Sequence, residues 1–574
     1  MNRITNLARL RTEVFEVCVI GGGATGAGCA LDAASRGLST ALIEQDDFGA
    51  ATSGTSTKLI HGGVRYLEQA FKNFDPKQLD LVKKALHERQ TLLQIAPHLA
   101  HPLALLTPCE TWIDGAYFSI GLKLYDLLAG SRQLEPSRWL SKSEALTWFP
   151  AFNRKQLHSA VLYYDGQFDD VRLNLALAQT ADEQGAAVVN HLKATHFRHD
   201  KAGRLVSVTV EDKVSGDSFA IQATVFVNAT GTRADALRQD ANEAQGVRMR
   251  ASKGSHVIMR AGAVGKTSAA LLVPKTADGR VLFAIPWRGH YLIGTTDTEA
   301  DPTETPYLLP DEARYLVEHV SHYLTTPLAM SDVTGGFAGL RPLLQADPNA
   351  DTKSLVRDHE VEIDPQSGLV SVMGGKWTTY RLMAQDTINA CCEQLEKTAK
   401  AITETLPLSG GDGYSPAFTV RFAQENPALP ADIAEHLTNS YGVRAGNVTR
   451  LINNEPVLAE RLSAAHPFIG AEVVYAVQEE MAQTLPDVLM RRIRLGVVDW
   501  AAALDVLPVV TRIMARELGW SAADAAGREA DFGRNITRMM EQAGMKKESF
   551  SASSLQQRPP EQHPIAENQS TRLV

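Results

Sequence analysis

The chain has 574 residues, of which 44% are hydrophobic and 21% are charged, and its formal net charge is −9 at pH 7. This length allows two or three domains with well-buried cores, and the acidic balance argues against nucleic acid as the main partner. The five cysteines lack metal-binding spacing and suit a reducing cytoplasm, so we predict no metal site and assign redox chemistry to a bound cofactor. The N-terminus lacks a signal-peptide core, and no stretch approaches the ~20 apolar residues of a membrane span.

The first predicted elements are a strand, a helix and a second strand. An apolar run at 17–20 leads into Gly21-x-Gly-x-x-Gly26, and a second apolar run at 40–43 ends in Glu44. In dinucleotide-binding units, such glycines permit a tight turn close to a pyrophosphate, and the acid, about 20 residues on, accepts the ribose hydroxyls. The pattern therefore predicts a nucleotide site, but it does not choose between NAD and FAD.

A polar loop and a helix follow. Residues 51–68 are rich in Gly, Ser and Thr, so their backbone N–H groups and hydroxyls suit a polar ligand. A helix is predicted from Asp75, with Pro76 at its first position and a stop at Pro97. We interpret this helix as structural.

The middle of the chain alternates between helix and strand signals. A helix predicted at 170–184 is followed by β-type runs at 187–191, 205–211, 219–223 and 225–229. We interpret these runs as an antiparallel insertion after which the chain returns to its nucleotide-binding sheet. A sheet-rich stretch follows at about 253–339, and a last returning strand is expected at 368–373.

Composition changes beyond about residue 405. A linker leads into a mostly helical region, and the final residues are polar and rich in Ser, Gln and Pro. We therefore divide the chain into a nucleotide-binding domain at 1–405, interleaved with a β-rich substrate domain at roughly 80–165 and 250–340, a helical domain at 406–545 and a disordered tail at 546–574.

The collected motifs resemble one family. The segments VIGGGATGAGCALDAASRG, ATSGTSTKLIHGGVRYLE, FVNATG, KGSHVI, GLRPL and GGKWTTYR are similar, in this order, to those of FAD-dependent, membrane-associated sn-glycerol-3-phosphate dehydrogenases, which belong to the D-amino-acid-oxidase-like flavoproteins. The resemblance spans roughly residues 15–540. It implies an α/β fold in which an FAD-binding Rossmann-like domain is joined to an antiparallel-sheet substrate domain and an α-helical C-terminal domain. The chain departs from the family at Thr232-Arg233, where Pro-Trp is usual, and at Gly54, where serine is common.

The resemblance also implies an activity. Glycerol 3-phosphate would be oxidised to dihydroxyacetone phosphate, with hydride passing to non-covalently bound FAD and electrons passing to a membrane quinone. A soluble oxidase that passes electrons to oxygen is the first alternative, and a nucleotide-binding regulator without turnover is the second. The implied place is the inner face of the cytoplasmic membrane, with peripheral attachment and a possible homodimer.

The implied substrate site needs cations for a phosphate dianion and a group that takes the hydroxyl proton. Arginine suits phosphate because its planar fork matches the oxygens, and the family motifs supply three arginines with hydroxyl neighbours: Arg65, Arg341, Arg357, Tyr66, Thr295 and Thr296. A structural ion pair is the alternative for each arginine. Lys376 would favour a developing negative charge. His61 suits a base because its ordinary pKa is about 6.5; an anchoring role is the alternative, and Arg65 or Lys376 could take the proton instead.

For the cofactor, the resemblance adds residues of the polar loop and of the segments that close on the flavin. Ala194 is expected beside the adenine. The complete predicted set is Gly21, Gly22, Gly23, Thr25, Gly26, Glu44, Thr52, Ser53, Thr57, Lys58, Gly62, Gly63, Ala194, Gly231, Gly375 and Thr378.

Membrane contact rests on two segments. Residues 117–132 carry aromatic and leucine side chains with flanking cations, and they form either an interfacial helix or, as we favour, a buried helix with a charged edge. A second basic cluster, formed by Arg491, Arg492 and Arg494, is interpreted as a membrane contact or a solvated face.

Overall fold

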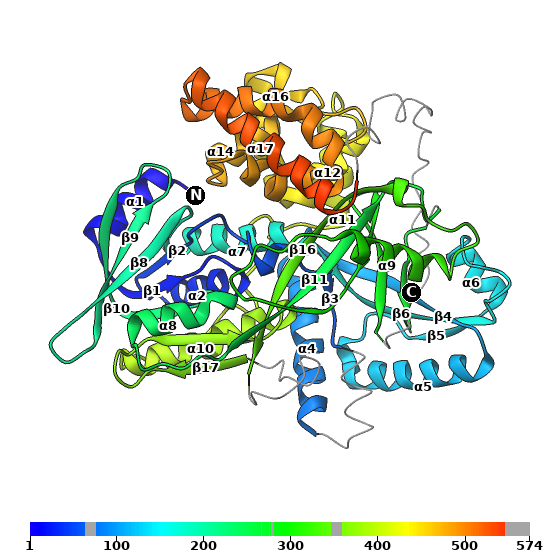
Figure 1. The fold of residues 1–574 in the computed structure, drawn as a ribbon, viewed down its shortest axis with the longest axis horizontal. Coiled ribbons are helices and arrows are strands. Elements are labelled where there is room, and N and C mark those ends of the chain that lie inside the picture. Colours follow the sequence, from blue (N-terminus) through cyan, green and yellow to red (C-terminus); the bar gives the residue numbers. More distant parts are fainter. Residues whose placement is uncertain (64–75, 266, 275, 277–279, 346–358, 546–574) are drawn as a thin grey trace.

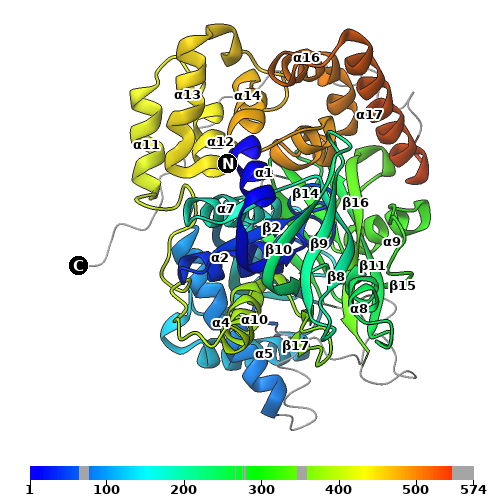
Figure 2. The same ribbon diagram turned by 90° about the vertical axis from the view of Figure 1, so that its left-hand side faces the viewer.

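The computed structural model describes residues 1–63, 76–265, 267–274, 276, 280–345 and 359–545 (Figure 1). Two β-sheets lie side by side, and a group of helices from the C-terminal part of the chain covers them both (Figures 1 and 2). Arg65, Tyr66, Arg357 and the predicted tail at 546–574 lie outside the described residues.

The first sheet contains the predicted nucleotide-binding unit. Among the described residues its strand order is β17-β18-β10-β1-β2-β7. The strands are β1 (Val14–Ile20), β2 (Thr40–Ile43), β7 (Ala187–Val189), β10 (Ser218–Asn228), β17 (His359–Ile363) and β18 (Val370–Gly374). β1 pairs in parallel with both β2 and β10, and α2 (Ala24–Ser35) connects β1 to β2. The predicted Rossmann-like fold is confirmed.

One strand prediction was wrong. The runs at 219–223 and 225–229, taken as two elements, belong to the single strand β10. Its first half alternates between buried and exposed side chains and pairs with β9 (Leu205–Asp212), which in turn pairs with β8 (Leu192–His199). Its second half is buried between β1 and β18. The change of burial pattern resembles a strand boundary, although the backbone continues.

The second sheet is mostly antiparallel. Its described order is β15-β11-β14-β13-β12-β4-β6-β3, with β16 on β11 and β5 on β6. The strands are β3 (Leu59–Ile60), β4 (Ala100–Cys109), β5 (Arg138–Ser141), β6 (Ser159–Phe168), β11 (Met249–Met259), β12 (Ala270–Val273), β13 (Leu282–Trp287), β14 (His290–Gly294), β15 (Thr298–Ala300) and β16 (Val333–Leu344).

The helices pack around these sheets. The first group comprises α1 (Arg3–Thr12), α4 (Pro76–Ile95), α5 (Trp112–Ala129), α6 (Lys142–Trp148), α7 (Asp170–Glu183), α8 (Ala234–Ala241), α9 (Pro310–Ser321) and α10 (Tyr380–Gln394). The C-terminal group comprises α11 (Pro416–Glu425), α12 (Ala431–Tyr441), α13 (Ala445–Asn454), α14 (Gly470–Glu479), α15 (Leu495–Val498), α16 (Trp500–Leu518) and α17 (Ala522–Gln542). None of the described helices is both long and apolar enough to cross a membrane.

The C-terminal helices share one hydrophobic core with the second sheet. Val257 and Leu292 of the sheet belong to the same buried cluster as Trp500 and Ile536 of the helices. Gly335 on β16 lies so close to the helices that a Cβ there would be 2.1 Å from the backbone oxygen of Val497. The helical domain is therefore held against the sheet by apolar burial as well as by close backbone approach.

Candidate active site

The glycine turn between β1 and α2 is shaped to lie against a ligand. Gly21 has φ +111°, and a Cβ on Gly26 would lie 1.8 Å from the oxygen of Gly21. A Cβ on Gly23 would lie 3.0 Å from Ser53 Oγ, so a side chain there would fill the space at the start of α2. Thr25 lies in the first turn of that helix, whose N–H groups suit a pyrophosphate. The residues present fit a dinucleotide.

Glu44 stands at the end of β2, opposite this turn. Its carboxylate accepts the N–H groups of Gly22 at 2.5 Å and of Asp46 at 2.8 Å. Burial raises the pKa of Glu44, while the two N–H contacts lower it. The carboxylate is thus fixed where an adenosine ribose would lie if the pyrophosphate occupied the glycine turn.

The polar loop brings three distant motifs together. Ser53 Oγ accepts the N–H of Ala24 at 2.9 Å. Thr52 Oγ1 donates to Leu340 O at 2.7 Å, and Trp377 Nε1 donates to Ser53 O at 2.8 Å. A single 3-10 turn, Thr52–Gly54, therefore bonds to the glycine turn, to the GLRPL strand and to the GGKWTT segment.

Lys58 holds this loop from inside. Its ammonium is fully buried and donates to Gly54 O at 3.3 Å, to Ser56 O at 3.0 Å and to Asp170 Oδ2 at 2.5 Å. Desolvation lowers the pKa of Lys58 to about 8, against the opposing effect of Asp170. These contacts commit the ammonium to protein groups, so Lys58 fixes the shape of the loop.

His256 is a site residue that motif reading did not single out. Its Nε2 lies 3.0 Å from Thr57 Oγ1, and its ring stacks on Phe337 at 4.7 Å between centroids. Burial, followed by the charges of Lys58 and Arg341, holds the pKa of His256 well below its ordinary value. A neutral imidazole therefore stands between the polar loop and Arg341. The KGSHVI motif contains this histidine but does not reveal that the fold brings it to Thr57.

Arg341 contacts Thr295 and Thr296, the two threonines predicted for the substrate site. Its Nη2 donates to Thr295 Oγ1 at 2.8 Å and to Thr296 O at 3.0 Å, while the Thr296 hydroxyl accepts the N–H of Ser255. Its Nη1 reaches Asp297 Oδ1 at 3.3 Å, a partner that the sequence reading missed. The side chain of Arg341 remains 28% exposed.

The other residues predicted beside the cofactor lie on strands or in the turns that follow them. Gly375 has φ +84°, and a Cβ there would lie 2.4 Å from Met383 Sδ. Lys376 follows it and is half-buried, whereas Thr378 is buried in the next turn. Gly231, with φ +60°, follows β10. Ala194 lies on β8, a strand that begins where the N–H of Leu192 bonds to Glu44 O at 2.7 Å.

His61 and two glycines follow β3, and a buried network fixes their backbone. The N–H of Gly62 donates to Tyr125 Oη at 2.7 Å, and that hydroxyl donates to Asp165 at 3.0 Å. Arg89 Nη1 donates to the same carboxylate at 2.7 Å. His61 is half-buried and adjoins Gly62, while Gly63 is buried with φ +83°. No sequence motif identified this network, because its members come from α4, α5, β6 and the segment after β3.

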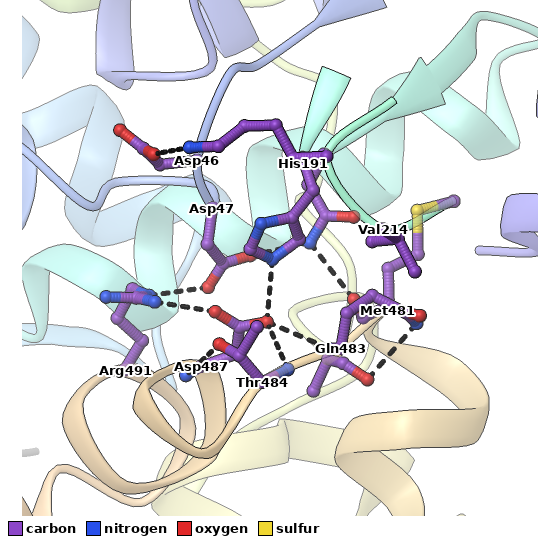
Figure 3. Close-up of polar contacts among 12 residues, drawn as sticks. Asp46, Asp47, His191, Val214, Met481, Gln483, Thr484, Asp487 and Arg491 are labelled. Atoms are coloured by element: carbon purple, nitrogen blue, oxygen red, sulfur yellow. Dashed lines mark hydrogen bonds and ion pairs between the residues drawn. The ribbon is translucent and has the colours of Figure 1, made fainter. Parts of the chain in front are cut away.

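Both predicted membrane segments need correction. Arg492 and Arg494 are 1% and 2% exposed, and Arg491 pairs with the buried Asp47 and Asp487 (Figure 3), so the basic cluster is neither solvated nor free for lipid. Conversely, the helix expected to be buried, α5, exposes a row of large apolar side chains. They are Trp112 (65%), Ile113 (61%), Tyr117 (50%), Ile120 (64%) and Leu127 (75%).

Comparison with known proteins gives consistent matches. A family model described as FAD dependent oxidoreductase matches residues 16–381, and one described as the C-terminal domain of alpha-glycerophosphate oxidase matches residues 401–525. The mitochondrial glycerol-3-phosphate dehydrogenase of Bos taurus is 42% identical over 89% of this chain and 71% of its own length.

Solved structures agree with these matches. The glycerol-3-phosphate dehydrogenase from Bacillus halodurans, complexed with FAD, is similar with a TM-score of 0.77 and 27% identity over 93% of this chain and 97% of that chain. The FAD-bound L-alpha-glycerophosphate oxidase from Mycoplasma pneumoniae shares the fold, with a TM-score of 0.53 and 17% identity over 68% of this chain and 97% of that chain.

Proposed function

The chain belongs to the family of FAD-dependent glycerol-3-phosphate dehydrogenases, and on this premise we propose that it oxidises sn-glycerol 3-phosphate to dihydroxyacetone phosphate. The single observation that carries the proposal is the polar loop at 52–58, which bonds to the glycine turn, to the strand of Arg341 and to the segment of Lys376. FAD, when bound, would accept the hydride from C2 of the substrate.

The chain's own residues supply binding and proton transfer. Arg341 and Thr295 would hold the phosphate, with Asp297 fixing the direction of the guanidinium. Arg65, Tyr66, Thr296 and Arg357 stay proposed contributors. Lys376 would stabilise negative charge that develops beside the substrate and flavin. His61 would take the hydroxyl proton, because it directly follows β3 beside the proposed site and an imidazole nitrogen can accept a proton.

The proposed cofactor set is the one given by the sequence. Gly21, Gly23 and Gly26 would admit the pyrophosphate, Glu44 would accept the ribose hydroxyls, and Ser53 would fix the loop beside them. The remaining contributors are Gly22, Thr25, Thr52, Thr57, Lys58, Gly62, Gly63, Ala194, Gly231, Gly375 and Thr378.

A spectroscopic titration tests the proposed reaction. Purified protein should carry releasable FAD, and the visible absorbance of the oxidised flavin should bleach when glycerol 3-phosphate is added without oxygen. Dihydroxyacetone phosphate should appear in equal amount. Bound FAD that stays oxidised in the presence of glycerol 3-phosphate would contradict the assignment of the substrate.

We also propose that the electrons pass to a membrane quinone and that the protein attaches peripherally to the inner face of the cytoplasmic membrane. The support is the exposed apolar row on α5, because apolar side chains of that size suit the interfacial region of a bilayer. Tyr125, on the buried side of the same helix, bonds to Gly62, so the helix that carries the exposed row also contacts the segment after β3.

The choice of acceptor can be measured directly. With lipid vesicles present, a short-chain quinone should be reduced faster than oxygen, and little peroxide should form. Stoichiometric peroxide, with no effect of quinone or lipid, would replace this proposal with the soluble oxidase.

A further inference from the structure

A short segment of the C-terminal domain, Asp487–Arg492, and the residues that follow it contact the FAD-binding half of the molecule. The segment forms a single π-helical turn, and Figure 3 shows the side chain of Arg491 bonded to both Asp47 and Asp487. Asp487, its first residue, accepts the N–H groups of Gln483 at 2.8 Å and Thr484 at 2.9 Å, so it also fixes the backbone just before the segment. The family resemblance gives this segment no part in cofactor binding.

The first contact is with the loop that follows Glu44. Asp47 is fully buried and accepts Arg491 Nε at 2.6 Å and Arg492 Nη2 at 3.1 Å, with a further close contact to Arg492 Nη1. Asn190 Nδ2 also donates to Asp47, at 2.8 Å. Asp47 lies only three positions after Glu44, the acid expected on the adenosine ribose, so the arginines fix the loop that follows Glu44.

The second contact is with the polar loop. Arg494 has φ +65°, and its Nη2 donates to Gly54 O at 3.1 Å and approaches Asp170 Oδ1 at 3.3 Å. Asp170 in turn accepts Lys58 and both the N–H and the hydroxyl of Ser56. The carbonyl that receives Arg494 immediately follows Ser53, so this arginine fixes the loop at the point where it meets the start of α2.

A metal ion is not needed to explain the buried acids. One ligand atom from each of Asp47, His191 and Asp487 lies within 4.8 Å of the others, which is a metal-like spacing. However, His191 Nε2 already lies 2.8 Å from Asp487 Oδ2, and Arg491 donates to both carboxylates. Guanidinium groups therefore occupy the place of a cation, and the cluster is a bridge between domains.

We propose that Arg492 and Arg494 are positioning residues for FAD: through Asp47 and Gly54 they hold the two loops that carry Glu44 and Ser53. FAD affinity and docking of the C-terminal domain are then linked, and the linkage is reciprocal because each contact favours the same loop conformation. The inference rests on the FAD site described above. It adds that this site is incomplete without residues near 490, far from every predicted FAD ligand in sequence.

Titration of FAD-free protein with FAD tests the proposal. Binding by the wild-type protein tests whether FAD is the cofactor, and binding by the variants tests whether the arginines of the C-terminal domain affect FAD affinity. Arg494→Met should raise the dissociation constant of FAD about tenfold, a typical size for coupling between sites. The matched control is Arg444→Met, which removes an ion pair with Glu183 across the same domain boundary but contacts neither loop nor the arginines near 490. The control should leave FAD affinity within about twofold of wild type, because a partly exposed ion pair contributes little and lies away from both loops.

A second measurement uses the unmodified full chain, in case Arg494→Met does not fold. Hydrogen exchange of the backbone amides at 483–498 should slow when FAD is added to the FAD-free protein. Arg494→Lys, which keeps the charge but shortens the reach, should bind FAD with intermediate affinity. The proposal would be overturned by unchanged FAD affinity in the Arg494 variants, or by hydrogen exchange at 483–498 that is equally fast with and without FAD.

Discussion

At the scale of residues, the proposed phosphate site centres on the guanidinium of Arg341, whose two terminal nitrogens have different partners. One nitrogen of Arg341 bonds to Thr295 and Thr296, and the other faces Asp297. Gly254 makes the arrangement possible, since a Cβ there would lie 2.1 Å from Arg341 Nη2. Arg341 therefore has a fixed direction before any ligand arrives, which reduces the entropy lost on binding.

Replacing Arg341 tests whether its guanidinium binds the substrate phosphate or only supports the fold. Hydrogen bonds to charged groups contribute about 1.5 to 3 kcal/mol, so Arg341→Ala should lower kcat/KM for glycerol 3-phosphate by about one to two orders of magnitude. Turnover of unphosphorylated glycerol, which has no dianion, should change far less. Steady-state kinetics on both substrates provide the measurement.

The matched control for that experiment is Arg260→Ala. Arg260 pairs with Asp332 on the surface, with 58% of its side chain exposed, so its loss should leave both substrates unaffected. If Arg341→Ala impairs both substrates equally, or releases FAD, the arginine supports the fold instead of the phosphate.

Residue types in motifs were predictable, whereas their partners were not. The glycines, Glu44 and Arg341 stand out because few other residues satisfy a tight turn, a ribose or a phosphate. His256 and Asp297 carry no such signal. His256 meets Thr57 only because β11 lies beside β14 and β16 in a particular register, and register is a property of the assembled sheet.

At the scale of elements, α5 shows the limit of periodicity. One side of the helix packs Leu122, Tyr125 and Ala129 into the protein, as the sequence analysis expected. The other side carries large apolar side chains that are exposed, and apolar side chains on two sides of a helix indicate burial without saying in what medium. A row of exposed apolar side chains of this size indicates an interaction site.

Charge introduced on that surface should detach the protein from lipid. Ile113→Glu combined with Ile120→Glu should sharply reduce co-sedimentation with vesicles of mixed neutral and anionic lipid, because each glutamate opposes apolar insertion and is repelled by anionic headgroups. Bleaching of the flavin by glycerol 3-phosphate should persist.

Val420→Glu serves as the comparison for this variant. Val420 is 59% exposed on α11, in the C-terminal helical domain, and its replacement should leave vesicle binding unchanged. Equal binding of the α5 variant and the Val420 variant would place the membrane contact on another surface.

At the scale of the whole molecule, the class of fold and its two sheets followed from local patterns, but the contacts between domains did not. The strand–turn–helix unit is compact in sequence, so its spacing is visible there. The bridge from Asp47 to Arg492 spans 445 residues, and nothing in the composition of either segment indicates the other. A run of arginines near 490 is equally typical of a solvated face, and only the tertiary structure shows that buried carboxylates neutralise it.

The distribution of the FAD site along the chain sets an order of events during synthesis. The glycine turn leaves the ribosome first, but β1 must wait for β10, and Asp47 must wait for Arg492. At about 5 to 20 residues per second, synthesis of the 445 residues from Asp47 to Arg492 takes about 20 to 90 s. Throughout that interval Asp47 lacks its buried arginine partners, so on the proposal above we expect the polypeptide to reach full affinity for FAD only after the residues near 490 have been made.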